Sequence, residues 1–252
     1  MSCHSHGVFE FAGLEARLTS HVTERMLTLA GLRAGQAVVD VGCGDGVVAR
    51  AALKRVQPGG SVHGFDPDAA AIGRARAQTI EGLSWEVSTA EAFQSPHRFD
   101  AALARWSLAS MPEPSAALTA LAHTLRPGAP FVFATWASAE WWSVPRAVIE
   151  RFVTLPPRRV GAPGALRFAD VEHALVLLAP WFQVEAVERL DSAVIEGAPE
   201  LLAAWVEHVF GGWTTTVPDL AACRAALRSE FERYPRLSGT THLVLARRSS
   251  VT

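Results

Sequence analysis

Three glycines alternate with other residues in Gly42-Cys43-Gly44-Asp45-Gly46, directly after the apolar run Ala37–Val41. Glycine adopts left-handed backbone conformations and lets the main chain approach a ligand closely. Val47–Val56 follows with helical spacing, and the N-terminus of a helix offers unpaired backbone N–H groups to an anion. The order of strand, glycine loop and helix predicts a site for a carboxylate or a phosphate. The glycine spacing alone leaves a simple structural turn open.

Two carboxylates accompany this loop. Asp40 stands inside the predicted strand, and Asp66 ends the second predicted strand, Val62–Phe65, 20 residues after Gly46. A carboxylate at that position can accept hydrogen bonds from both hydroxyls of a ribose. Asp66-Pro67 is also a good helix start, because Asp caps helices and Pro suits their first turn. Following the glycine loop, ribose binding is the favoured interpretation.

A nicotinamide-dependent oxidoreductase is the natural rival, since it also binds a nucleotide at such a loop. Its fingerprint Gly-x-Gly-x-x-Gly would place the third glycine at position 47, which is Val47 here. A nicotinamide-dependent oxidoreductase is therefore a less favoured interpretation of the loop.

These segments resemble the class I S-adenosylmethionine-dependent methyltransferases, and among them the group of ubiquinone and menaquinone methyltransferases. The resemblance covers roughly Leu27–Thr135. The segments that carry it are Asp40–Gly46, Asp66, Phe99–Trp106 and Leu125–Gly128. It implies an α/β fold with a seven-stranded, mostly parallel Rossmann-like sheet, an antiparallel last strand and a helical cap or lid.

The resemblance also implies that S-adenosylmethionine lies at the carboxyl ends of the first strands. Gly42 and Gly44 would face its methionine portion, Asp66 would hold the ribose, and Thr89 and Ala90 would border the adenine. The full predicted cofactor set is Asp40, Gly42, Cys43, Gly44, Asp66, Pro67, Thr89, Ala90, Glu91 and Arg105.

Two positions depart from the family pattern. Thr89 stands where relatives often carry an Asp that binds the adenine amino group. Ala109-Ser110 replaces polar or histidine residues that are often found near the pocket, which removes an obvious candidate base. Arg105 remains open between holding an acidic group of the cofactor or substrate and pairing with a surface carboxylate.

Methyl transfer is an in-line displacement that depends mainly on alignment, and it needs a base only if the acceptor must lose a proton. His21, in the segment Leu14–Leu29 that often lids the site in this family, is the one candidate base; a solvated or core histidine is the alternative. Trp106, Trp136 and Trp141 are predicted to line a hydrophobic or aromatic substrate pocket, with ordinary packing as the alternative.

Composition narrows the classes of partner. The 252 residues are 49% hydrophobic and carry a net charge of −2, without the basic stripe that nucleic-acid binding needs. Nor does Arg105-Trp106-Ser107-Leu108 resemble the Asn-Pro-Pro-aromatic segment of nucleic-acid methyltransferases. Three scattered cysteines, and the absence of a signal peptide or a long apolar run, predict a cytoplasmic protein without a membrane partner. Neither the cysteines nor the histidines show metal-ligand spacing.

The chain is predicted to form one domain, 1–252, divided into an N-terminal lid (1–30), a cofactor-binding core (31–135), a cap insertion (136–168) and a C-terminal part (169–252). The remaining strands are expected at Leu83–Val87, Phe99–Arg105, Pro130–Thr135, Val184–Leu190 and His242–Ala246. Helices are expected at Pro67–Ala77, Pro114–Leu125, Ala169–Leu178, Glu200–Phe210 and Pro218–Phe231. Thr216 and Asp219 suggest a capping box for the last helix.

The sequence thus predicts a monomeric or homodimeric methyltransferase that acts on O, N or C of a small, apolar or aromatic metabolite. The Ala-, Arg- and Val-rich composition is typical of GC-rich bacterial genomes and, by association, of natural-product biosynthesis. The alternative is a protein of the same fold that binds S-adenosylmethionine without catalysis, or that serves a reaction other than methylation.

Overall fold

The computed structural model describes residues 19–154, 164–196, 199–210 and 216–250. The chain divides into two compact units. The core unit comprises residues 20–137, 161–190 and 241–252, and the second unit comprises residues 1–19, 138–160 and 191–240. The division into lid, core and cap made from the sequence remains a prediction.

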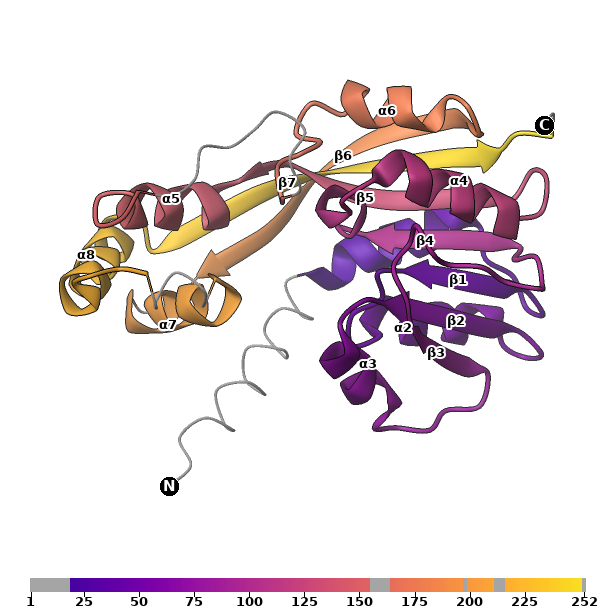
Figure 1. Ribbon diagram of the computed structural model, residues 1–252, viewed down its shortest axis with the longest axis horizontal. Coiled ribbons are helices and arrows are strands. Elements are labelled where there is room, and N and C mark those ends of the chain that lie inside the picture. The colour runs from indigo at the N-terminus through magenta and orange to yellow at the C-terminus, as the bar shows by residue number, and fades with distance from the viewer. Residues whose placement is uncertain (1–18, 155–163, 197–198, 211–215, 251–252) are drawn as a thin grey trace. The chain divides into compact units, whose positions relative to one another are not determined.

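One seven-stranded sheet runs in the order β3-β2-β1-β4-β5-β7-β6 (Figure 1). The strands are β1 (Ala37–Val41), β2 (Ser61–Asp66), β3 (Leu83–Val87), β4 (Ala101–Arg105), β5 (Pro130–Ala139), β6 (Phe182–Glu196) and β7 (Arg236–Arg248). The first five strands pair in parallel, whereas β7 runs against its neighbours. This mostly parallel sheet with an antiparallel last strand confirms the predicted fold class.

The strand order places a topological switch point at β1. The chain moves outward from β1 to β2 and β3, then returns to pair β4 against the other side of β1. Loops that leave such neighbouring strands in opposite directions open a crevice at the carboxyl edge of the sheet, where α/β proteins bind ligands. The glycine loop after β1 and the segment after β4 meet at this edge.

Helices cover both faces of the sheet because its central strands are apolar on both sides. The helices are α2 (Val47–Val56), α3 (Ala69–Arg76), α4 (Pro114–Thr124), α5 (Glu140–Ile149), α6 (Glu172–Leu178), α7 (Pro199–Phe210), α8 (Leu220–Arg233) and a short 3-10 helix η1 (Leu108–Ser110). Residues 19–30 form a further helix. In the core unit, α4 and α6 pack on one face through Leu118, Leu121 and Leu178. The helix of residues 19–30 and α2 pack on the other face through Val22, Met26 and Ala52.

Most predicted elements are confirmed within one to three residues, but three strands are longer than expected. Strand β5 runs to Ala139, β6 runs to Glu196, and β7 begins at Arg236. Their extensions mix polar and apolar residues, as in Arg236-Leu237-Ser238, so the apolar runs mark only part of each strand. These extensions continue from the core unit into the second unit.

The region 136–168 contains an unpredicted helix. Residues 136–139 complete β5, and α5 follows with Pro145 inside it. Proline removes one helical hydrogen bond and normally interrupts a helix, which is why the sequence pattern concealed α5. The expected capping box of α8 is wrong: Asp219 is itself the N-cap and accepts a hydrogen bond from the Ala222 N–H at 2.9 Å.

Candidate cofactor site at the glycine loop

The glycine loop needs its glycines for two separate reasons. Gly42, Gly44 and Gly46 all have left-handed backbones, with φ of 67°, 55° and 85°. A Cβ on Gly42 would also lie 2.3 Å from the Cβ of Ser107, whereas a Cβ on Gly44 would meet no atom within 4 Å. Gly42 therefore lets the loop pack against the end of β4, and Gly44 leaves open space beside the loop.

Ser107 fixes this close approach from the β4 side. Its hydroxyl donates to the carbonyl of Val41 at 2.6 Å, so the segment after β4 is tied to the end of β1. No role for Ser107 can be predicted from the sequence, because an isolated serine after a strand carries no signal without its neighbour in space.

Trp85 packs under the other end of the loop. A Cβ on Gly46 would lie 2.3 Å from its ring, and a Cβ on Gly64 would lie 2.7 Å from it. The indole of β3 therefore fills the space that glycines leave on two neighbouring segments. The sequence predicts that Trp85 lies in a strand. Its contact with the loop depends on how β2 and β3 pair.

Asp66 accepts two backbone hydrogen bonds. Its Oδ2 accepts from the Gly44 N–H and its Oδ1 accepts from the Asp68 N–H, both at 2.9 Å. The alternative interpretation as a helix cap is wrong for Asp66, because Asp68 is the N-cap of α3 and accepts from the Ala70 N–H. The half-buried carboxylate of Asp66 is held at the loop with oxygen lone pairs left for other donors.

Asp40 is buried in the central strand, with 1% of its surface exposed. Its carboxylate accepts from the backbone N–H of Ala49 in the first turn of α2, where Gly46 supplies no side-chain cap. Its Oδ2 has no hydrogen-bond partner among the residues that the structure describes. Burial raises the pKa of Asp40 to about 7, although the charge of Arg105 opposes this rise.

The charge of Arg105 acts on this buried carboxylate. Its guanidinium donates to the hydroxyl of Thr23 at 2.8 Å, which links the end of β4 to the helix of residues 19–30. The guanidinium carbon also lies 5.1 Å from the centre of the Trp106 ring, within the range of a cation–π contact. Arg105 thus contacts both the helix of residues 19–30 and an aromatic ring.

Trp106 has φ of 60°, the one left-handed residue other than glycine in the described chain. Its indole stacks on Trp136 at 4.5 Å and donates to the Thr241 hydroxyl at 3.3 Å. A strained bulky residue at the end of a strand is held by its surroundings and is common at ligand sites. The structure thus brings together two of the three predicted substrate residues.

Trp141 belongs to the second unit, on α5, where it packs edge-to-face with Trp142 at 6.4 Å. His21 is exposed on the helix of residues 19–30. Their roles in substrate binding and catalysis remain predictions.

The residues expected near adenine are arranged around a turn after β3. Exposed Thr89 accepts from the Ala92 N–H at 3.3 Å, Ala90 is buried, and Glu91 accepts from the Glu113 N–H before α4. Thr89 and Glu91 thus shape the local chain, and Pro67 lies exposed beside Asp66.

Cys43 is buried within the loop, and its thiol lies 3.6 Å from the Gly44 carbonyl oxygen. Burial, followed by the charges of Asp40 and Asp66, raises the pKa of this thiol far above its usual value. Cys43 is therefore a protonated packing group rather than a nucleophile.

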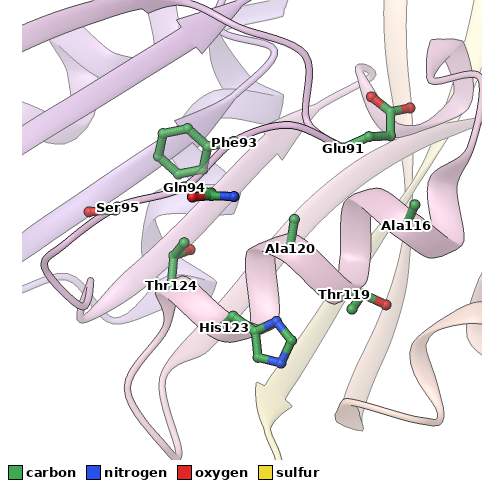
Figure 2. Close-up of a pocket in the computed structure, with 9 residues that line it drawn as sticks. All are labelled: Glu91, Phe93, Gln94, Ser95, Ala116, Thr119, Ala120, His123 and Thr124. Carbon is green, nitrogen blue, oxygen red and sulfur yellow. The ribbon is translucent and has the colours of Figure 1, made fainter.

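A pocket of about 700 Å³ lies away from the glycine loop, between α4 and the segment after β3. Figure 2 shows Phe93, Gln94 and Ser95 on that segment opposite the helix. Thr119 and Thr124 on its α4 side donate to carbonyls of their own helix, and Thr119 also accepts from the Trp181 indole. With these polar groups satisfied, the pocket offers less to a ligand than the loop does. In the second unit, α5, α8 and β7 line another pocket of about 580 Å³.

Neither a metal site nor a membrane span is found among the described residues. No group of three or more His, Cys, Asp or Glu side chains is placed there to hold a metal ion. Every helix in this part of the chain is too short or too polar to span a lipid bilayer.

Sequence relatives point to methyl transfer. A ubiquinone biosynthesis O-methyltransferase from Stutzerimonas stutzeri is 32% identical over 107 residues, which cover 40% of this chain and 45% of that protein. Its counterpart from Pseudomonas fluorescens SBW25 is 35% identical over the same length, with the same shares of both chains. The matches span less than half the length of these relatives.

Solved structures share the fold. The [4+2]-cyclase SpnF superposes with a TM-score of 0.60 at 21% identity, covering 91% of this chain and 81% of SpnF. The N-methyltransferase NodS from Bradyrhizobium japonicum, in complex with S-adenosyl-L-homocysteine, gives 0.53 at 16% identity, covering 92% and 87%. At these identities the likeness concerns the fold alone.

A family model described as a methyltransferase domain matches residues 12–186, which is more than half of the chain. The match spans the glycine loop, Asp66 and the segment after β4. The chain belongs to the methyltransferase-domain family.

Proposed function

We propose that this chain transfers a methyl group from S-adenosylmethionine to an O, N or C atom of a small apolar or aromatic molecule. The observation that carries the proposal is the joined arrangement of the glycine loop and Asp66, in which the Gly44 N–H donates to the carboxylate at 2.9 Å.

The residues at the loop fit the cofactor. Gly44 leaves open space where a Cβ would stand, so a ligand can lie against the backbone there. Asp66 has lone pairs for ribose hydroxyls, and the orphaned Oδ2 of Asp40 offers an acceptor behind the loop. Gly42, Cys43, Thr89, Ala90, Glu91, Pro67 and Arg105 complete the proposed binding set.

When bound, the cofactor supplies an activated methyl group on a sulfonium sulfur. The chain then has to align the acceptor and exclude water. Trp106 and Trp136, stacked at the end of β4, favour an acceptor with an apolar or aromatic surface. Exposed His21 and the second unit's Trp141 stay candidates for proton transfer and substrate contact.

The first test is calorimetric titration with S-adenosylhomocysteine, with NAD as the control ligand. We expect micromolar binding of S-adenosylhomocysteine, and about a 100-fold loss in Asp66→Asn, because charge-assisted hydrogen bonds contribute roughly 1.5–3 kcal/mol each. Asp219→Asn, an N-cap change that keeps its capping oxygen, is the matched control and should bind like wild type. NAD binding in preference to S-adenosylhomocysteine would overturn the proposal.

The second candidate is a protein that binds the same cofactor without transferring its methyl group. The similarity to SpnF, whose reaction is a [4+2] cyclisation, supports keeping this candidate. Fold does not determine the reaction carried out at a site. Release of S-adenosylhomocysteine from S-adenosylmethionine in the presence of an acceptor would separate the two functions.

A further inference from the structure

Besides Oδ2 of Asp40, two buried polar atoms of the core unit have no hydrogen-bond partner among the described residues. One is the hydroxyl oxygen of Thr135, a fully buried residue. The other is Nδ1 of His242, a buried atom in a residue that is half-buried as a whole. An unsatisfied buried polar group costs about 1–3 kcal/mol, so two of them call for an explanation.

The sheet brings these two residues to the same place. Strands β5 and β7 are antiparallel neighbours, and the Arg248 N–H donates to the Ala129 carbonyl. Thr135 lies six residues after Ala129, and His242 lies six residues before Arg248, so regular pairing puts them opposite each other. Directly opposed residues have Cβ atoms about 5 Å apart.

Both side chains face the side of the sheet that α4 and α6 cover. Phe133 and Val244 stand two residues away from Thr135 and His242, and both belong to the core cluster on that side. Residues two apart in a strand share a face. The pairing and the shared face together place a hydroxyl and an imidazole side by side.

The charge state of this pair favours a neutral ligand group. Burial lowers the pKa of His242, the charge of Arg189 on β6 lowers it further, and Asp170 before α6 opposes both. The imidazole is therefore neutral at neutral pH, with one nitrogen that donates and one that accepts. A neutral imidazole and a hydroxyl can each donate to or accept from an alcohol or phenol.

The pair lies at the level where the glycine loop begins. Arg105 at the end of β4 pairs with Ala134, the residue before Thr135, and β7 is the next strand after β5. Strands are spaced about 4.8 Å apart, so His242 lies roughly 10 Å from β4 across the sheet. The pair therefore lies at the carboxyl edge of the sheet, on the face of β5 opposite to Trp136.

We propose that Thr135 and His242 form a polar subsite that binds a hydroxyl group of the acceptor molecule. The inference rests on the proposed function, because it assigns the subsite to the acceptor of that reaction. It narrows the acceptor to alcohols and phenols.

Phenol and toluene test the subsite, since they differ by one hydroxyl. Binding to the full chain saturated with S-adenosylhomocysteine is followed by NMR, with the His242 imidazole assigned from His242→Gln. We expect phenol to bind wild type at least 10-fold more tightly than toluene and to shift the His242 signals. Thr135→Val, which keeps the side-chain shape, should remove this preference, and Thr135→Ser, which keeps the hydroxyl, should retain it.

Equal binding of phenol and toluene to wild type, or an unchanged preference in Thr135→Val, would overturn the subsite. His242→Gln measured in the same way provides a second decision should Thr135→Val fail to fold. Calorimetry with S-adenosylhomocysteine keeps the two proposals apart. If that compound does not bind wild type, the proposed function fails, while the comparison of phenol with toluene on the unsaturated chain still decides the subsite.

Discussion

Gly42→Ala is expected to lower the free energy of unfolding by roughly 2–5 kcal/mol. A left-handed backbone costs an alanine about 1–2 kcal/mol, and overpacking typically adds about 1–3 kcal/mol. The overpacking arises because the new Cβ would lie 2.3 Å from the Cβ of Ser107, whose hydroxyl is already bonded to Val41. Urea denaturation followed by circular dichroism measures this loss.

Gly44→Ala is the matched control within the same loop. It has a similar φ of 55° but meets no atom within 4 Å, so only the backbone cost of about 1–2 kcal/mol remains. Its Cβ would occupy the open space proposed for the cofactor, so it should fold and yet lose affinity for S-adenosylhomocysteine.

A double variant tests the cause of the Gly42 effect. Gly42→Ala with Ser107→Gly removes the colliding atoms and should recover the overpacking part of the loss. Equal urea midpoints for Gly42→Ala and Gly44→Ala would show that the contact with Ser107 is not what requires glycine at position 42.

Asp40 should make the ligand-free protein less stable as the pH rises from about 4 to 7. The pKa of Asp40 is raised from 3.8 to about 7 in the folded chain, so the folded state holds a proton that the unfolded state has released over this range. Stability therefore falls with rising pH, by about 4 kcal/mol in total for a difference of this size. Asp40→Asn, which cannot ionise, should lack this fall.

Urea unfolding of both proteins between pH 4 and 8, without ligand, measures the effect as a difference. The difference is needed because His63 and His242 have lowered pKa values in the folded chain. These two residues make the protein less stable as the pH falls, which is opposite to the effect of Asp40. Asp219→Asn, an exposed cap, should keep the wild-type slope. If Asp40→Asn followed the same pH dependence as wild type, Asp40 would already be ionised throughout this range.

The alternation of strands and helices and the location of the glycine loop follow from local patterns of residues. Apolar runs such as Ala37–Val41 and Leu83–Val87 mark buried strands because both of their sides must be covered. Gly42, Gly44 and Gly46 mark the loop because side chains are disfavoured at their backbone angles. The position of Asp66 is predicted by the number of residues between it and the loop, because the length of a βαβ unit sets that number.

The surroundings of these residues depend on how the whole chain packs. No local pattern of residues marks Ser107, Trp85 or His242. Their contacts arise from strand order and register, which bring distant segments together. The same holds for Arg105, which donates to the Thr23 hydroxyl and whose charge acts on the buried acid of the neighbouring strand. Local patterns report what one segment needs, whereas burial and its effect on Asp40 depend on every segment that packs around it.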